Sequence, residues 1–204
     1  MKNEQKKLLF RAVFCGFLLA VTASFFPFAA ASAELSDQVV RLHIVANSDG
    51  EEDQRVKLLV RDAVLQEAAN WYGDAKTLEE ANTALCVHLG AIESAANEAL
   101  QKSGSTDRAK VQMTDQYFPT RDYETFSFPA GKYRTLKITI GEGKGHNWWC
   151  VVFPALCLPA AEGNDAFSTL TQAQQELVQK PERYQVKFKA LEWYEALCQA
   201  LDFS

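Results

Sequence analysis

The chain has 204 residues, of which 48% are hydrophobic and 23% charged, and these ordinary globular values exclude a largely disordered chain and a protein of many membrane spans. The formal net charge is −5, and because the first 33 residues carry +3, the remainder carries −8. Such an acidic remainder argues against nucleic acid or an anionic lipid surface as the principal partner.

The first 33 residues have the three parts of a secretory signal peptide. A basic start precedes the apolar residues 12–26, and the small residues Ala31-Ser32-Ala33 follow. We therefore predict export and cleavage after Ala33, which leaves residues 34–204 as a single extracytoplasmic domain. The alternative is a retained membrane anchor, since residues 12–31 are long enough to span a bilayer.

The first elements after the signal are a strand and a helix. Alternation of apolar residues over 39–46 predicts a strand, which ends at the turn of residues 47–50. Ser48 and Glu51 have the spacing of a capping box, and apolar residues then recur at the helical period.

Thr77 and Glu80 repeat the capping-box pattern and predict a second helix that runs to about Lys102. Its apolar stripe includes His88. A histidine in this position favours a core side chain over a metal ligand or a catalytic base.

From Lys110 onward the pattern changes to a period of two residues. Alternation predicts an antiparallel meander that closes with a strand from Trp148 to Phe153. A last strand over 184–188 and a closing helix over 191–201 complete the chain. The predicted fold is α+β: a single domain with a largely antiparallel sheet, two long helices on one face, and a C-terminal strand and helix.

A glycine-rich turn, GEGKGHN, leads directly into two tryptophans. Three glycines in five residues permit positive φ angles and close approach of the backbone. Trp148 and Trp149 must face opposite sides of their strand, which favours one as a core side chain and the other as an exposed binding anchor.

Two long segments carry a resemblance to a known family. The segments GKYRTLKITIGEGKGHNWWCVVFPALC and VVRLHIVANSDGEEDQRVKLLVRDAV resemble stage II sporulation protein R, a family of secreted signalling proteins of endospore-forming bacteria. The resemblance is strong over residues 38–64 and 131–157. It implies a protein that is secreted from the forespore into the space between the forespore and mother-cell membranes.

The resemblance also implies a partner and a role. The partner is a membrane-embedded aspartic protease, contacted on its extracytoplasmic side, which processes a pro-sigma factor of the pro-sigma-E type in the mother cell. The densest parts of the match are the candidate contact segments. The candidate partner-binding residues are Arg41, His43, Asn47, Asp49, Glu142, Lys144, His146, Asn147, Trp148 and Trp149. On this view the membrane is met only transiently, through the signal peptide.

No constellation in the sequence identifies a catalytic centre. His146 and Cys150 are four positions apart, which is about 13 Å in an extended chain and too far for a thiolate–histidine pair. The three histidines lack the spacing of a zinc site, and GEGKG lacks the spacing and the ending of a phosphate-binding P-loop. We therefore predict no enzyme, no metal and no cofactor. The alternative is an extracytoplasmic hydrolase of cell-wall material, with His146 and a carboxylate as acid and base.

Four cysteines follow the signal: Cys86, Cys150, Cys157 and Cys198. An even number outside the cytoplasm permits three complete pairings. Because Cys150 and Cys157 flank a proline turn, we predict a disulfide between them, worth about 2.5 kcal/mol in chain entropy. A pairing of Cys86 with Cys198 stays open.

Overall fold

The computed structural model describes residues 2–123, 126–156, 167 and 170–201, and the chain divides into two compact units. Unit 1 consists of Met1–Glu34, Pro119–Gly131 and Glu176–Ser204, and unit 2 consists of Leu35–Phe118 and Lys132–Gln175. Each unit is described by itself. That residues 34–204 form one domain stays a prediction.

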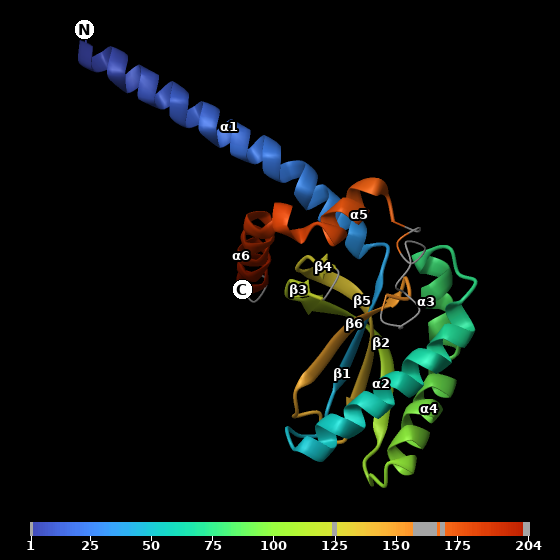
Figure 1. The fold of residues 1–204 in the computed structure, drawn as a ribbon. Coiled ribbons are helices and arrows are strands. Elements are labelled where there is room, and N and C mark those ends of the chain that lie inside the picture. Colours follow the sequence, from blue (N-terminus) through green and yellow to red (C-terminus); the bar gives the residue numbers. More distant parts are fainter. Residues whose placement is uncertain (1, 124–125, 157–166, 168–169, 202–204) are drawn as a thin grey trace. The chain divides into compact units, whose positions relative to one another are not determined.

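Unit 2 is built on a four-stranded sheet with the strand order β2-β5-β1-β6 (Figure 1). The strands are β1 (Val40–Val45), β2 (Ala109–Phe118), β5 (Gly131–Ile140) and β6 (Asn147–Phe153). β1 is buried along its whole length, as its position inside the sheet requires. The α+β class is therefore confirmed.

The predicted meander is wrong in one respect, because β1 lies between β5 and β6 and these two consecutive strands do not pair. β1 runs parallel to β5 and antiparallel to β6. The alternation in each strand does not encode which strand becomes its neighbour. A short turn between β5 and β6 suggests a hairpin, but here it spans a third strand.

Three helices lie on one side of this sheet: α2 (Glu51–Tyr72), α3 (Leu78–Val87) and α4 (Leu89–Lys102) (Figure 1). Apolar side chains at helical spacing on α2 and α4 form the core against the sheet. These buried side chains include Val56, Val60, Val64, Ile92, Ala96 and Leu100. The helices thus cover one sheet face, as predicted.

The second predicted helix is divided at His88 into α3 and α4. Thr77 caps α3 by accepting a hydrogen bond from the backbone N–H of Glu80, as predicted. His88 is half-buried and stacks on Trp71 with 3.5 Å between ring centroids, so it is not the core side chain that its stripe predicts. The break follows Val87 and precedes Gly90, which are weak helix formers.

Unit 1 combines helices with a small hairpin. Its elements are α1 (Lys2–Ser36, of which the last residues belong to unit 2), the hairpin of β3 (Arg121–Asp122) and β4 (Ser127–Phe128), the 3-10 turn Pro181–Arg183, and α6 (Gln185–Leu201). The helix α5 (Gln172–Gln179) is divided between the two units.

The predicted strand over 184–188 is wrong, because this segment joins the 3-10 turn to the first turn of α6. Tyr184 and Phe188 are four positions apart, which suits one face of a helix as well as it suits alternation. Both rings pack on Phe28 of α1, with centroids 5.8 and 5.5 Å away. This distant partner, and not the local pattern, selects the helix.

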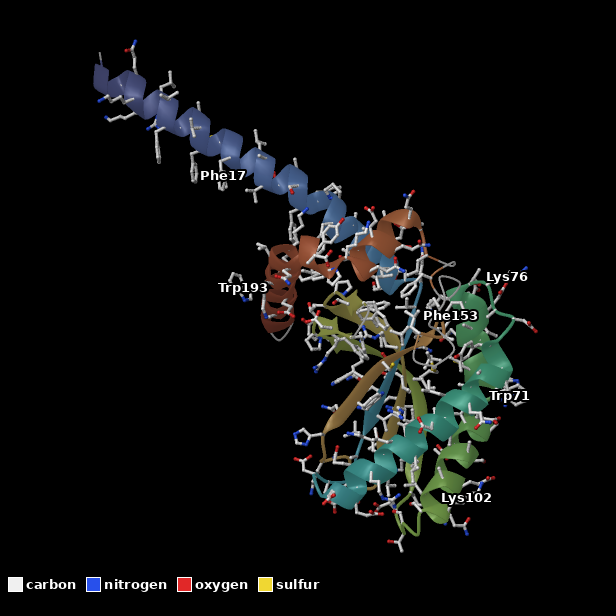
Figure 2. All side chains as sticks on the ribbon, viewed as in Figure 1. Phe17, Trp71, Lys76, Lys102, Phe153 and Trp193 are labelled. Atoms are coloured by element: carbon white, nitrogen blue, oxygen red, sulfur yellow. The ribbon has the colours of Figure 1, made fainter. Side chains whose placement is uncertain are left out.

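Among the described residues, one helix is long and apolar enough to cross a membrane, and it is the N-terminal segment Glu4–Ser36. A signal sequence meets the same criterion, so the helix accords with both the signal peptide and the anchor. Its large apolar side chains from Leu8 to Phe26 are mostly exposed, and Phe17 points away from the ribbon in Figure 2.

Candidate functional site

The turn between β5 and β6 is shaped by its glycines. Gly141 and Gly143 have φ angles of 56° and 63°, which residues other than glycine rarely adopt. Gly145 lies so close to the end of β1 that a Cβ atom there would collide with the backbone carbonyl of Ser48. Both predicted uses of glycine, positive φ and close approach, are therefore present.

Hydrogen bonds join this turn to the turn after β1. The backbone N–H of Lys144 donates to the carbonyl of Asn47 (3.1 Å), and that of Gly145 donates to the carbonyl of Ala46 (2.9 Å). The Asn47 side chain accepts from the N–H of Glu142 (2.9 Å). The two segments, about a hundred positions apart in the sequence, thus form one surface. We call residues 47–49 and 142–147 the paired-turn surface.

Ionisable side chains project from the paired-turn surface. The Asp49 carboxylate accepts from the backbone N–H of His146 and lies 2.6 Å from its Nδ1. Lys144 and Glu142 form an ion pair at 2.6 Å. These side chains are 58 to 76% exposed, so the pairs add little stability and remain accessible to a partner.

The start of α2 supports the surface from behind. Asp53 accepts hydrogen bonds from Ser48 (2.6 Å) and from Asn47 (3.1 Å), so Ser48 does not cap the helix in the predicted box with Glu51. The ammonium group of Lys57 donates to the carbonyl of His146 (3.1 Å). Lys57 is only 5% exposed, and burial lowers its pKa.

Arg41 lies in the interior and not on the paired-turn surface. Its guanidinium donates to the carbonyl of Cys150 (2.9 Å) and lies 4.3 Å from the ring centroid of Phe118 and 5.0 Å from that of Tyr133. With 0% exposure it cross-links β6 to the aromatic side chains of β2 and β5. The geometry therefore gives Arg41 a structural role.

His43 is also buried, with 4% exposure. Its ring stacks on Trp149 at 3.9 Å and lies between two amides, with Nδ1 3.0 Å from Gln116 and Nε2 2.8 Å from Asn147. A neutral imidazole donates from only one nitrogen, so one of the two amides must turn its nitrogen toward the ring.

Burial is the main influence on the pKa of His43 and lowers it. The positive charge of Lys137 acts in the same direction, whereas the hydrogen bonds to Asn147 and Gln116 act against it. The ring is therefore kept neutral and fixed, which suits a support for Asn147 at the edge of the paired-turn surface.

The two tryptophans face opposite sides of β6, as predicted. Trp148 pairs in register with Ile44 and packs under Arg61 of α2, with 4.6 Å from the guanidinium to the ring centroid. Trp149 pairs with His43 on the other face. Both are half-buried, so neither is the strongly exposed anchor that the sequence suggests.

The cysteines are only partly described. Cys150 is buried and disulfide-bonded, and Cys157, its predicted partner, lies outside the described residues. The pairing therefore stays a prediction. Cys15 and Cys86 are free and exposed. The side chain of Cys198 also lies outside the described part of the chain.

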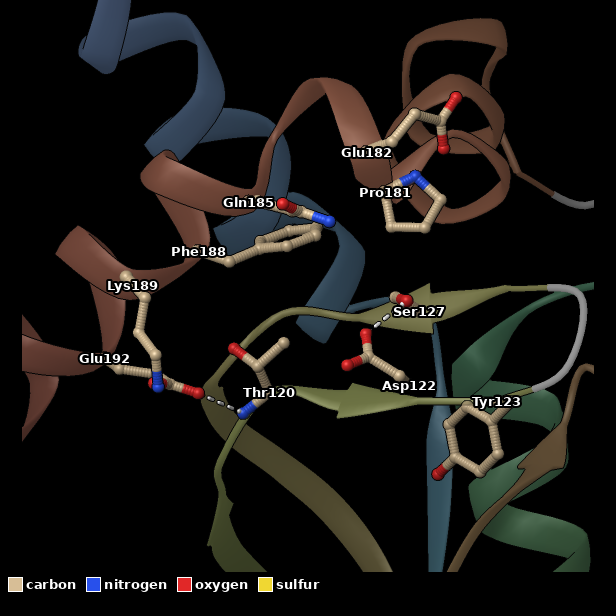
Figure 3. Close-up of a pocket in the computed structure, with 10 residues that line it drawn as sticks. All are labelled: Thr120, Asp122, Tyr123, Ser127, Pro181, Glu182, Gln185, Phe188, Lys189 and Glu192. Atoms are coloured by element: carbon tan, nitrogen blue, oxygen red, sulfur yellow. Dashed lines mark hydrogen bonds and ion pairs between the residues drawn. The ribbon is translucent and has the colours of Figure 1, made fainter.

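Unit 1 contains a cavity of about 540 Å³ between its hairpin and α6 (Figure 3). Its carboxylates are already engaged: Glu192 accepts from the N–H of Thr120 (3.1 Å) and pairs with Lys189 (2.7 Å), and Asp122 accepts from Ser127 (2.6 Å). This cavity does not follow from the sequence pattern, because it depends on α6 beginning where a strand is predicted.

Within residues 2–123, 126–156 and 170–201, no three His, Cys, Asp or Glu side chains are grouped so that they could hold a metal ion. On the paired-turn surface, the His146 imidazole and the Asp49 carboxylate contact each other directly.

Comparison with known proteins gives one consistent result. The family described as stage II sporulation protein R matches residues 36–162. Stage II sporulation protein R of Bacillus subtilis (strain 168) is 42% identical over 123 residues, which cover 60% of this chain and 55% of that relative. No solved structure matches the chain. The matched region begins just after the predicted cleavage position and includes both halves of the paired-turn surface.

Proposed function

The chain belongs to the stage II sporulation protein R family, and on that premise we propose that it is an exported signal and not an enzyme. It is secreted from the forespore into the space between the two membranes. There it binds the membrane-embedded aspartic protease on its extracytoplasmic side. Binding activates the protease, which then processes its pro-sigma factor in the mother cell.

The observation that carries this proposal is the pairing of the two turns. The hydrogen bonds from Lys144 and Gly145 to the end of β1 bring together the segments of densest family likeness and present them as one exposed surface. Loops raised on a packed sheet are the usual place for recognition residues. The partner is therefore expected to contact residues 47–49 and 142–147.

The mechanism that fits such a surface is differential binding. A ligand that binds the active form of the protease more tightly than the inactive form shifts the population toward activity without a chemical step. Because the turns are held by backbone hydrogen bonds, little conformational entropy is lost on binding. The charges of Asp49, Glu142 and Lys144 add specificity and speed of encounter more than affinity.

The proposal is tested by expressing this protein with the protease and its pro-sigma substrate in a host that lacks all three. Lys144→Ala is expected to reduce processing modestly, and higher doses of the variant are expected to restore it by mass action. Lys102→Ala is the matched control, since Lys102 is an exposed lysine on α4 with a weak ion pair to Glu98. Full processing with a chain that lacks the exposed charges of both turns would refute the proposal.

The contact between His146 and Asp49 favours a second candidate, the hydrolase of cell-wall material. A carboxylate that orients an imidazole is a common arrangement in general acid–base catalysis. This candidate makes a different prediction: His146→Ala abolishes signalling at every dose while binding to the protease is unchanged, and the wild-type protein degrades purified peptidoglycan. A signal rescued by dose, with intact peptidoglycan, rejects it.

A further inference from the structure

The helix α6 carries an exposed apolar stripe that the paired-turn surface does not explain. Val186 is 84% exposed and Trp193 is 75% exposed, and Figure 2 shows Trp193 pointing away from the ribbon. They are seven positions apart and therefore lie on one helical face. The opposite face of α6 buries Phe188 and Leu191. The helix is thus packed on one side and apolar on the other.

The position of α6 within unit 1 indicates what covers this stripe. Lys187 donates to the carbonyl of Ser24 on α1 (2.9 Å), and Phe28 of α1 packs on Phe188. The exposed apolar side chains of α1 run from Leu8 to Phe26, a rise of about 28 Å in a helix. That length is close to the roughly 30 Å hydrocarbon core of a bilayer. The contact with α6 therefore lies where a membrane-embedded α1 would leave the bilayer.

We propose that, while α1 is attached and embedded, the Val186–Trp193 face of α6 rests in the interfacial layer of the same phospholipid bilayer. Tryptophan is enriched at that depth because its ring is apolar and its N–H is polar. Lys187 and Lys189 flank the stripe on the helix, but Lys187 donates to Ser24 and Lys189 pairs with Glu192, so the membrane contact is carried by the apolar side chains. The contact goes beyond the transient passage of a signal peptide, because a folded part of the domain takes part in it.

The test uses the full, uncleaved chain reconstituted into phosphatidylcholine–phosphatidylglycerol vesicles, with and without bromine on the upper acyl chain. Subtracting the emission of Trp193→Phe from that of the wild type isolates the signal of Trp193. This signal is expected to be blue-shifted relative to tryptophan in water and to be largely quenched by the brominated lipid. Trp71→Phe is the control, since Trp71 stacks on His88 and donates to Glu67, and its signal is expected to be unquenched.

A second pair of variants separates lipid from protein as the occupant of the stripe. Val186→Glu is expected to relieve the quenching of Trp193, whereas Val87→Glu, at a similarly exposed valine on α3, is expected to leave it unchanged. The proposal is overturned if Trp193 is unquenched in brominated vesicles and open to an aqueous quencher. It is also overturned if Trp193 is shielded only when two copies of the chain associate.

Discussion

The exposed surface of unit 2 and that of unit 1 differ in chemistry and in how they are held. The paired-turn surface of unit 2 is polar, and it is positioned by hydrogen bonds to the backbone just after β1 and from the Lys57 side chain of α2. The exposed side chains of α1 and α6 in unit 1 are apolar, and ring packing around Phe28 joins the two helices. Polar groups bind a partner specifically only when hydrogen bonds fix their orientation, whereas apolar contact is non-directional and requires only that the side chains be exposed. Substitutions in the two units should therefore fail in different ways.

The largest expected effect is at Gly145. In Gly145→Ala, the new Cβ would meet the backbone carbonyl of Ser48, which cannot move without breaking the pairing of the turns. We expect a loss of about 3 kcal/mol or more in the free energy of unfolding, measured by chemical denaturation. Gly90→Ala is the matched control, because nothing lies within 4 Å of its Cβ position in α4, and it should gain about 0.5–1 kcal/mol. If the two variants were equally stable, the close approach of Gly145 to Ser48 would not be what requires glycine at this position.

Phe28→Ala tests the packing of unit 1 in the same way. Phe28 is 4% exposed, and its removal deletes both ring contacts with the start of α6. The free energy of opening α6 is expected to fall by about 3 kcal/mol, read by hydrogen exchange of its amides. The amides of α4 in unit 2 serve as an internal reference and should keep their protection. The control is Phe26→Ala, at a site 76% exposed on the same helix, which should change the protection of neither α6 nor α4. If the amides of α6 keep their protection in Phe28→Ala, the packing described is wrong.

Asn47→Ala should have a smaller effect, of about 1–2 kcal/mol, because it removes one hydrogen bond to the N–H of Glu142 and one to Asp53. Thermal unfolding measures the loss of stability, and in the signalling assay a higher dose of the variant should be needed for the same extent of processing. The comparison variant is Asn70→Ala, whose side chain makes one long, exposed contact with Glu67. If the two variants unfold alike, the hydrogen bonds of Asn47 do not position the turn.

The smallest expected effect depends on pH and arises at His43. Burial lowers its pKa below the unfolded value of 6.5, so the unfolded state binds more protons, and the stability falls as the pH is lowered through 6.5 toward the folded pKa. Between pH 7.5 and 5.5 the wild type should lose about 1 kcal/mol more than His43→Gln. An identical pH dependence in the two proteins would show that the ring is not held neutral by the fold.

The features that were correctly predicted from the sequence depend on residues close together in the chain. The local pattern was sufficient to predict three features, because each depends on residues within a few positions. They are the role of Gly141 and Gly143 in the turn, the opposite facing of Trp148 and Trp149, and the cap at Thr77. The family likeness named the two segments as candidate contacts, but the sequence did not predict that hydrogen bonds would join them.

The failures depend on distant partners. Alternation over 184–188 is equally compatible with a strand, and only Phe28 on α1 decides for a helix. For Arg41 and His43, nothing local shows that Phe118 and Trp149 cover them, and whether they contact the partner stays a prediction. The break at His88 likewise involves the stack with Trp71 of the preceding helix.

The contact between α1 and α6 also sets an order in time. Lys187 and Ser24 are 163 positions apart, and a ribosome that adds about 5–20 residues per second needs about 10–30 s to cover that distance. Throughout this interval Phe28 has been synthesised but its partners have not. A peptidase that acts on residues 31–33 within the interval meets a nascent helix without its partners, and one that acts later meets a docked helix. Cleavage after Ala33, which stays a prediction, would therefore compete in time with the docking of α1 on α6.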